Sequence, residues 1–129
     1  MNIELSDSIS KCFSEHGALA QAIPGFKARQ AQLDMATAVQ GAIKDKAQLV
    51  VEAGTGTGKT FAYLAPALLA GKKVIVSTGT KALQEQLFHR DLPLVKKALR
   101  PMMKTALLKG RSNYLCINWM CQYWTKCNI

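Results

Sequence analysis

The stretch VEAGTGTGKT, residues 51–60, decides the fold that this sequence predicts. Its three glycines let backbone N–H groups close around phosphate oxygens, which is the requirement of a phosphate-binding P-loop. A short apolar run precedes the stretch and a helix-like segment follows it, which is the setting of such loops. We therefore predict a nucleotide-binding loop made of Ala53, Gly54, Thr55, Gly56, Thr57, Gly58, Lys59 and Thr60.

Two residues of this loop are the candidate catalytic groups. Lys59 is placed to reach the β- and γ-phosphates of a nucleotide, and the hydroxyl of Thr60 is a typical Mg²⁺ ligand. The positive end of the following helix favours an anion at the same place. Ala53 stands where the general pattern has glycine, and alanine is small enough to fit. The loop thus predicts binding of ATP with Mg²⁺.

The regions on either side of the loop predict an α/β fold. Short apolar runs at 48–52, 73–77 and 105–108 read as buried strands, and strands that alternate with helices favour a parallel sheet. Helical spacing of apolar residues covers 5–23, 28–44, 59–70, 81–90 and 93–99. We expect part of a RecA-like P-loop NTPase domain, with a parallel sheet of about three strands flanked by helices.

Charge is distributed unevenly along the 129 residues. Residues 72–129 hold eleven Lys/Arg and two acidic residues, so the whole net charge of +9 lies there. Such a basic half indicates a polyanionic partner, most often nucleic acid. About half of the residues are apolar, as in a globular protein, but no run approaches a membrane span and no secretory signal is visible. We expect a cytoplasmic protein without a membrane partner.

Four segments together resemble one helicase family: IPGFKARQAQLDMA (23–36), VEAGTGTGKTFAYLAPALL (51–69), VIVSTGTKALQEQLFHRDLP (74–93) and LLKGRSNYLC (107–116). They are similar to the N-terminal part of the DinG/YoaA branch of the XPD-like superfamily-two iron–sulfur DNA helicases. The resemblance implies an N-terminal helical segment at 1–23 and the first part of a helicase ATP-binding domain at 24–110. Residues 111–129 would then be the start of an iron–sulfur region or an aberrant truncated tail.

The same resemblance implies roles for residues outside the P-loop. Arg29 and Gln32 fall in an R-x-x-Q segment that contacts adenine in such helicases. The run Thr78, Gly79, Thr80 and Lys81 would contact the backbone of single-stranded DNA. Thr80 can also cap the helix that follows, and the two roles are compatible.

The resemblance further makes Cys116 the first ligand of a 4Fe-4S cluster. Cys121 and Cys127 follow with the spacing that the family shows for its later ligands, but the long insertion between the first ligand and the others is missing. Three interpretations stay open. The tail is out-of-frame sequence, or a deletion product that joins the first ligand to the later ones, or a compact metal site.

Catalysis needs a carboxylate that the sequence does not supply in the usual form. Hydrolysis normally uses an Asp-Glu pair that ends a later strand, and none of the eight acidic residues forms such a pair. Two hypotheses follow: the chain is the N-terminal part of an ATP-dependent DNA helicase of the DNA-repair type, or it is a non-catalytic fragment that binds nucleotide and DNA without turnover. A small P-loop kinase or assembly ATPase is a third, weaker interpretation. Whether this chain is itself an enzyme is left open.

Overall fold

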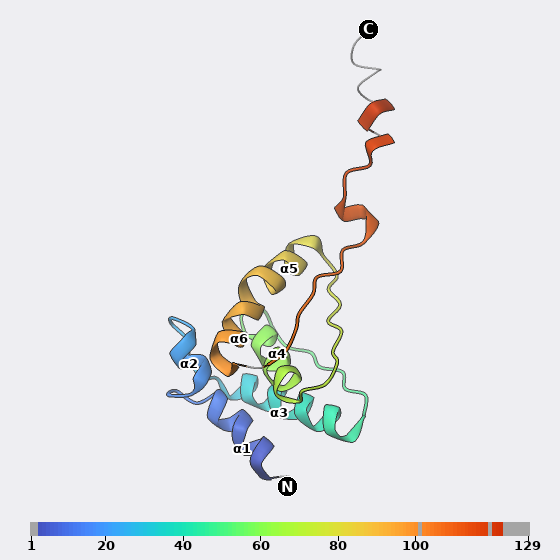
Figure 1. The fold of residues 1–129 in the computed structure, drawn as a ribbon. Helices are drawn as coiled ribbons and strands as arrows, with labels where there is room; N and C mark the ends of the chain where they lie inside the picture. The colour runs from blue at the N-terminus through green and yellow to red at the C-terminus, as the bar shows by residue number, and fades with distance from the viewer. Residues whose placement is uncertain (1–2, 101, 119, 123–129) are drawn as a thin grey trace.

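The computed structural model describes residues 3–100, 102–118 and 120–122, and within them the regular structure is helical (Figure 1). The elements in chain order are α1 (Ile3–Cys12), α2 (Ala18–Ala22), α3 (Gln30–Asp45), α4 (Lys59–Leu69), α5 (Lys81–Gln86), the π-helix η1 (Leu87–Asp91), α6 (Leu92–Leu99) and the short 3₁₀-helix η2 (Arg111–Asn113). The six α-helices form one body, and the chain beyond residue 110 extends away from it (Figure 1). None of the described helices is long and apolar enough to cross a membrane.

The predicted parallel sheet is wrong for the described part of the chain. Segments 48–52, 73–77 and 105–108 have no regular secondary structure, and no backbone hydrogen bond joins any two of them. Apolar β-branched runs favour extended backbone, but a strand also needs a neighbouring chain about 4.8 Å away to bond with. The described residues provide no such neighbour, so the α/β assignment is replaced by a helical body with extended connections.

The extended connections leave much apolar surface open. Val50 is 97% exposed between Leu49 at 43% and Val51 at 40%, and Ile75 is 91% exposed between two valines near 40%. This alternation follows from extended backbone, in which successive side chains point to opposite faces. One face of each of these two segments is therefore about half as exposed as the other.

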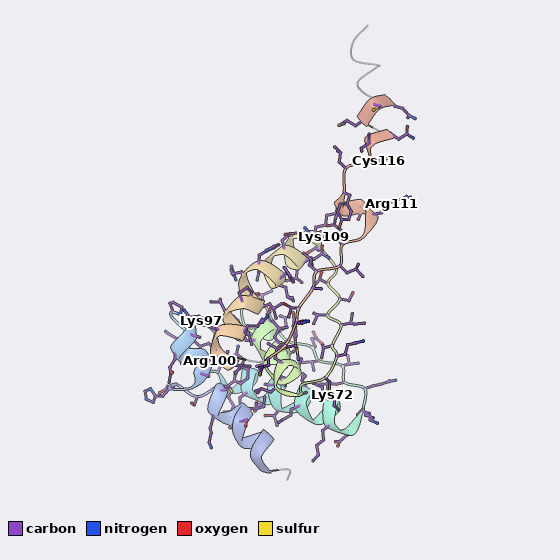
Figure 2. The ribbon with its side chains drawn as sticks, in the orientation of Figure 1. Lys72, Lys97, Arg100, Lys109, Arg111 and Cys116 are labelled. Atoms are coloured by element: carbon purple, nitrogen blue, oxygen red, sulfur yellow. The ribbon has the colours of Figure 1, made fainter. Side chains whose placement is uncertain are left out.

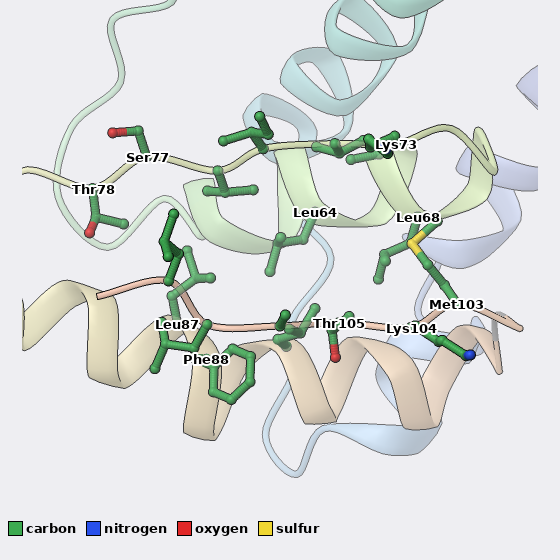
Figure 3. Close-up of a pocket in the computed structure, with 18 of the residues that line it drawn as sticks. Leu64, Leu68, Lys73, Ser77, Thr78, Leu87, Phe88, Met103, Lys104 and Thr105 are labelled. Carbon is green, nitrogen blue, oxygen red and sulfur yellow. The ribbon is translucent and has the colours of Figure 1, made fainter. Parts of the chain in front are cut away.

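A cavity of about 540 Å³ separates two of these connections. Residues 73–78 and 103–108 run side by side across it, with Leu64 and Leu68 of α4 and Leu87 of η1 in its wall (Figure 3). No backbone hydrogen bond joins the two connections across it. It lies away from the P-loop, because none of the residues 53–60 lines it.

The core forms around α4, as the helical spacing predicted. Ala62, Leu64, Ala65 and Leu68 are buried there against α3, η1 and α6. Pro66 lies inside α4 and is itself buried, and the helix continues past it to Leu69. The predicted helix over 59–70 is therefore confirmed to within a residue.

The single helix expected over 5–23 is instead two helices. The chain turns between α1 and α2 at Gly17, where an added Cβ would lie 2.1 Å from the carbonyl oxygen of Lys11. Leu19 of α2 and Ile9 of α1 are both buried by this reversal. The apolar spacing predicted which residues face the core, but it did not reveal the turn.

Candidate nucleotide-binding loop and its surroundings

The P-loop connects the extended segment 47–53 to the first turn of α4. Gly56 and Gly58 have φ angles of 76° and 78°, in the left-handed region that glycine adopts without strain. Gly58 is the N-cap of α4, and its carbonyl accepts hydrogen bonds from the amides of Phe61 and Ala62. The amide groups that precede Phe61 in this first turn are the ones that a helix leaves for an external acceptor.

Lys59 is folded back over the loop. Its Nζ donates to the carbonyl oxygens of Ala53 at 2.8 Å and Gly54 at 2.6 Å. Thr57 Oγ1 donates to the Gly54 carbonyl at 3.0 Å, which tightens the same turn. The loop carbonyls thus satisfy the ammonium group, and an anion in the loop must draw Lys59 away from them.

Two side chains from the start of α3 reach the loop from outside. The Arg29 guanidinium donates to the Gly56 carbonyl, and Gln32 Nε2 donates to the Gly58 carbonyl at 3.0 Å. Gln32 is only 4% exposed. The structure thus brings both residues of the R-x-x-Q segment to the P-loop, where they hold its two left-handed glycines.

A polar cluster around Tyr63 and Asp91 was not predicted from the sequence. Burial raises the pKa of the Tyr63 phenol and is the largest cause of its shift. A hydrogen bond with Thr60 lowers this pKa, and the charge of Asp91 raises it further. Asp91 is 2% exposed and accepts hydrogen bonds from Gln86 Nε2 and Arg90 Nε, both at 3.1 Å. The cluster connects the loop helix α4 to η1 through residues that lie about 30 positions apart in sequence, so local spacing could not predict it.

The segment Thr78, Gly79, Thr80 and Lys81 leads into α5. Thr80 is the N-cap, and its Oγ1 accepts a hydrogen bond from the Leu83 amide at 3.2 Å, as predicted. Lys81 is exposed and its Nζ donates to the carbonyl oxygen of Ser112. Gly79, Thr80 and Lys81 are exposed, and Thr78 is half-buried.

The basic residues of the second half that the structure describes do not gather into one patch. Lys97 and Arg100 lie on and after α6, Lys72 follows α4, and Lys109 and Arg111 lie where the chain leaves the body (Figure 2). The sequence-level prediction of a basic half is correct as a count. The structure distributes that charge over several faces, so any polyanion would contact only part of it.

The cysteines do not form a metal centre within the described residues. Cys116 and Cys121 are in no disulfide and are exposed on the chain that extends from the body, Cys12 is buried in the core, and Cys127 lies outside the described residues. Among the residues that the structure describes, no group of three His, Cys, Asp or Glu side chains could hold a metal ion. Two exposed thiols are fewer than the four that a 4Fe-4S cluster takes.

Comparison with known proteins identifies the family. The profile described as DEAD/DEAH box helicase matches residues 30–124, most of the chain. The chain belongs to the DEAD/DEAH box helicase family. The matched region begins with α3 and includes the P-loop and α5.

Curated relatives support the DinG/YoaA resemblance within this helicase family. The ATP-dependent DNA helicase YoaA of Haemophilus influenzae is 61% identical over 115 residues, which are 89% of this chain and 18% of that protein. YoaA of Escherichia coli is 67% identical over 105 residues, 81% of this chain and 16% of its own length. The ATP-dependent helicase DinG of Mycobacterium tuberculosis is 47% identical over 122 residues, 88% of this chain and 18% of its own. No solved structure matches the chain.

These alignments confirm that the chain resembles the DinG/YoaA branch. They also show that it spans less than a fifth of the length of the curated relatives it matches. The names of these relatives describe proteins of which this chain matches only a part.

Proposed function

We propose that this chain is the ATP-binding N-terminal part of an ATP-dependent DNA helicase of the DNA-repair type, acting in the cytoplasm. The observation that carries the proposal is the P-loop, in which two left-handed glycines, a lysine over the loop carbonyls and the start of α4 occur together. Bound ATP with Mg²⁺ would supply the free energy for movement along DNA. Lys59 would hold the phosphates, Thr60 would hold the metal ion, and Arg29 and Gln32 would lie beside the adenine.

The loop fits such an occupant because its donors are close at hand. Lys59 already bends over the loop, and its two carbonyl partners are weaker acceptors than a phosphate oxygen, since hydrogen bonds to charged groups are roughly twice as strong. Phosphate in the loop would therefore draw the ammonium group from Ala53 and Gly54. Gln32, held on the Gly58 carbonyl, would keep the first turn of α4 in place during this exchange.

The experiment that tests nucleotide binding is a calorimetric titration of the chain with Mg·ATP. Lys59→Ala removes one charge-assisted hydrogen bond to phosphate. We expect its affinity for Mg·ATP to fall at least about ten- to hundredfold, which would take binding below the measurable range. Lys97→Ala is the matched control, because it removes an exposed lysine of α6 and should bind normally. Unchanged affinity in the Lys59 variant would refute the assignment of the loop.

Single-stranded DNA is the proposed second partner, at Thr78, Gly79, Thr80 and Lys81. Two observations support this. Gly79, Thr80 and Lys81 are exposed, and the Lys81 ammonium group, which now donates to the Ser112 carbonyl, could donate to a DNA phosphate instead. A labelled oligodeoxynucleotide should bind Lys81→Ala more weakly than the parent chain, with a smaller dependence on salt. Equal binding and equal salt dependence would remove this segment from the DNA contact.

The iron–sulfur part of the proposal rests on the resemblance alone. Cys116 would be the first ligand of a cluster in the longer protein, and the described residues do not provide a complete donor set with it. Cys121 and Cys127 remain candidates without a structural argument. We derive no step of the function from a cluster.

The second candidate function is binding without turnover, and the acidic residues favour it. No Asp-Glu pair follows the P-loop in this sequence, and Asp91, a buried carboxylate whose charge acts on Tyr63 of α4, already accepts hydrogen bonds from Gln86 and Arg90. For this chain we therefore expect binding of ATP but no hydrolysis. Steady-state ATPase assays with and without single-stranded DNA decide the matter, since DNA-stimulated turnover by the chain alone would exclude the non-catalytic fragment.

A further inference from the structure

The chain leaves the helical body beside α5. Residues 108–112, here called the exit segment, pass α5 before the chain extends away toward Cys116 (Figure 2). Extended chain without a sheet has few ways to hold a fixed course, because its backbone groups lack regular partners. Side-chain contacts with the helical body can supply what the backbone lacks here.

Three side chains on one face of α5 bind the exit segment. Lys81 Nζ donates to the Ser112 carbonyl, Gln84 Nε2 donates to the Leu108 carbonyl at 3.2 Å, and Glu85 pairs with the ammonium group of Lys109. Positions 81, 84 and 85 share a helix face because they are three and four residues apart. The three contacts therefore act together on one short stretch of chain.

Charge makes Glu85 the centre of this arrangement. One carboxylate oxygen pairs with Lys109, and the other lies 3.1 Å from His89 Nε2, one turn further along. The hydrogen bond from Lys109 is the largest cause that lowers the pKa of Glu85, and the charges of Lys109 and His89 lower it further. Lys81 on the same helix face is engaged with Ser112 and adds a further positive charge to this face.

We propose that Glu85 is a positioning residue, which with Lys81 and Gln84 fastens the exit segment to α5 and so fixes the direction in which the chain carries Cys116 away from the body. The inference goes beyond the proposed function, because these contacts need neither nucleotide nor DNA. Lys81 belongs both to the proposed DNA contact and to this anchor, so a DNA phosphate there would compete with the Ser112 carbonyl, whereas Gln84 and Glu85 serve the anchor alone.

Two amides in the exit region report on the anchor. The amides of Asn113 and Tyr114 donate to the carbonyls of Gly110 and Arg111, inside the turn that Lys81 holds through Ser112. Their hydrogen-exchange rates, measured by NMR on the full chain, should rise when the exit segment detaches. We expect Glu85→Lys to accelerate both by about two- to fivefold, the range typical of an exposed ion pair.

Charge exchange separates positioning from a general loss of structure. Lys109→Glu alone should accelerate exchange as Glu85→Lys does, and the double variant Glu85→Lys/Lys109→Glu should restore slow exchange. Lys97→Glu, an equal change of charge on α6, should have no effect. Unchanged exchange in both single variants, or no recovery in the double variant, would overturn the proposal.

A pH series gives an independent readout. The contact exists while Glu85 is ionised, so it is lost as the pH falls through the lowered pKa of Glu85, and amide exchange (corrected for its intrinsic pH dependence) should accelerate there. Glu85→Gln should remove this transition, and a transition that survives in Glu85→Gln would assign it to another group. Because none of these measurements contains ATP or DNA, their failure is distinct from a failure of nucleotide binding.

Discussion

At the scale of single residues, Gly58 is the position where the P-loop tolerates change least. Its φ of +78° disfavours any side chain, and an added Cβ would lie 2.1 Å from Gln32 Nε2. We expect Gly58→Ala to lower the free energy of unfolding by about 1–3 kcal/mol. Urea unfolding measures this. Gly54→Ala is the control, because Gly54 lacks a positive φ and nothing lies within 4 Å of its added Cβ, so that variant should unfold like the parent.

Gln32 allows the two causes of that loss to be separated. In a Gln32→Ala background, the close contact with the Cβ at position 58 is absent and only the strained φ remains. Gly58→Ala should then cost less than it does in the parent chain, so the double-mutant cycle has a coupling free energy of roughly 0.5–3 kcal/mol. Strict additivity would show that Gln32 does not touch the loop in solution.

Cys12 gives a prediction about pH. Burial raises the pKa of this thiol, so the folded chain keeps its proton to a higher pH than the unfolded chain does. The stabilisation is complete below the ordinary thiol pKa of about 8.5 and is lost as the pH rises through the raised value. Urea unfolding between pH 8 and 10 should show stability that falls with pH, and Cys12→Ala should reduce the slope. Cys116→Ala, at an exposed thiol, should leave the slope unchanged.

At the scale of elements, replacing either of two glycines by alanine should change the stability of the chain in opposite directions. Gly17 forms the reversal between α1 and α2, where a Cβ would meet two backbone carbonyls, so Gly17→Ala should destabilise the chain by about 1–3 kcal/mol. Gly41 lies inside α3 with nothing near its added Cβ, so Gly41→Ala should stabilise it by about 0.5–1 kcal/mol. Thermal unfolding compares both with the parent. A stabilising Gly17→Ala would mean that α1 and α2 form the one helix that apolar spacing predicts.

The helices could be predicted from the sequence and the strands could not, because the two bond to different partners. A helix makes its hydrogen bonds within itself, so the spacing of Leu33, Ala36 and Val39 was enough to predict α3. A strand makes its bonds with another segment, and the apolar runs at 48–52 and 73–77 hold no information about whether a partner lies beside them. The three expected strands failed for this reason, while α3 and α4 were placed to within two residues.

The candidate site divides in the same way. Residues 53–60 lie together in the sequence, so eight neighbouring positions are enough to predict a phosphate-binding loop, which stays a prediction. The approach of Gln32 to Gly58 and of Asp91 to Tyr63 depends on how α3 and η1 pack on α4. Such contacts between distant positions follow from the packing of elements, which single-sequence patterns do not contain.

At the scale of the whole molecule, the bare face of the extended connections determines how the chain behaves in solution. Val50, Ile75 and Leu108 are each more than 90% exposed on backbone that has no ladder partner, and such surfaces bind further chains. Sedimentation velocity should show association that grows with protein concentration. The double variant Val50→Lys/Ile75→Lys should shift the chain toward monomer. Each substitution should alter the free energy of unfolding by only about 0.5 kcal/mol, because these exposed side chains make few contacts within the chain. Leu115→Lys, on the chain that extends from the body, is the matched control and should leave association unchanged. If the double variant instead unfolds the protein, these two side chains are packed in solution, and the bare face is not the surface through which the molecule associates.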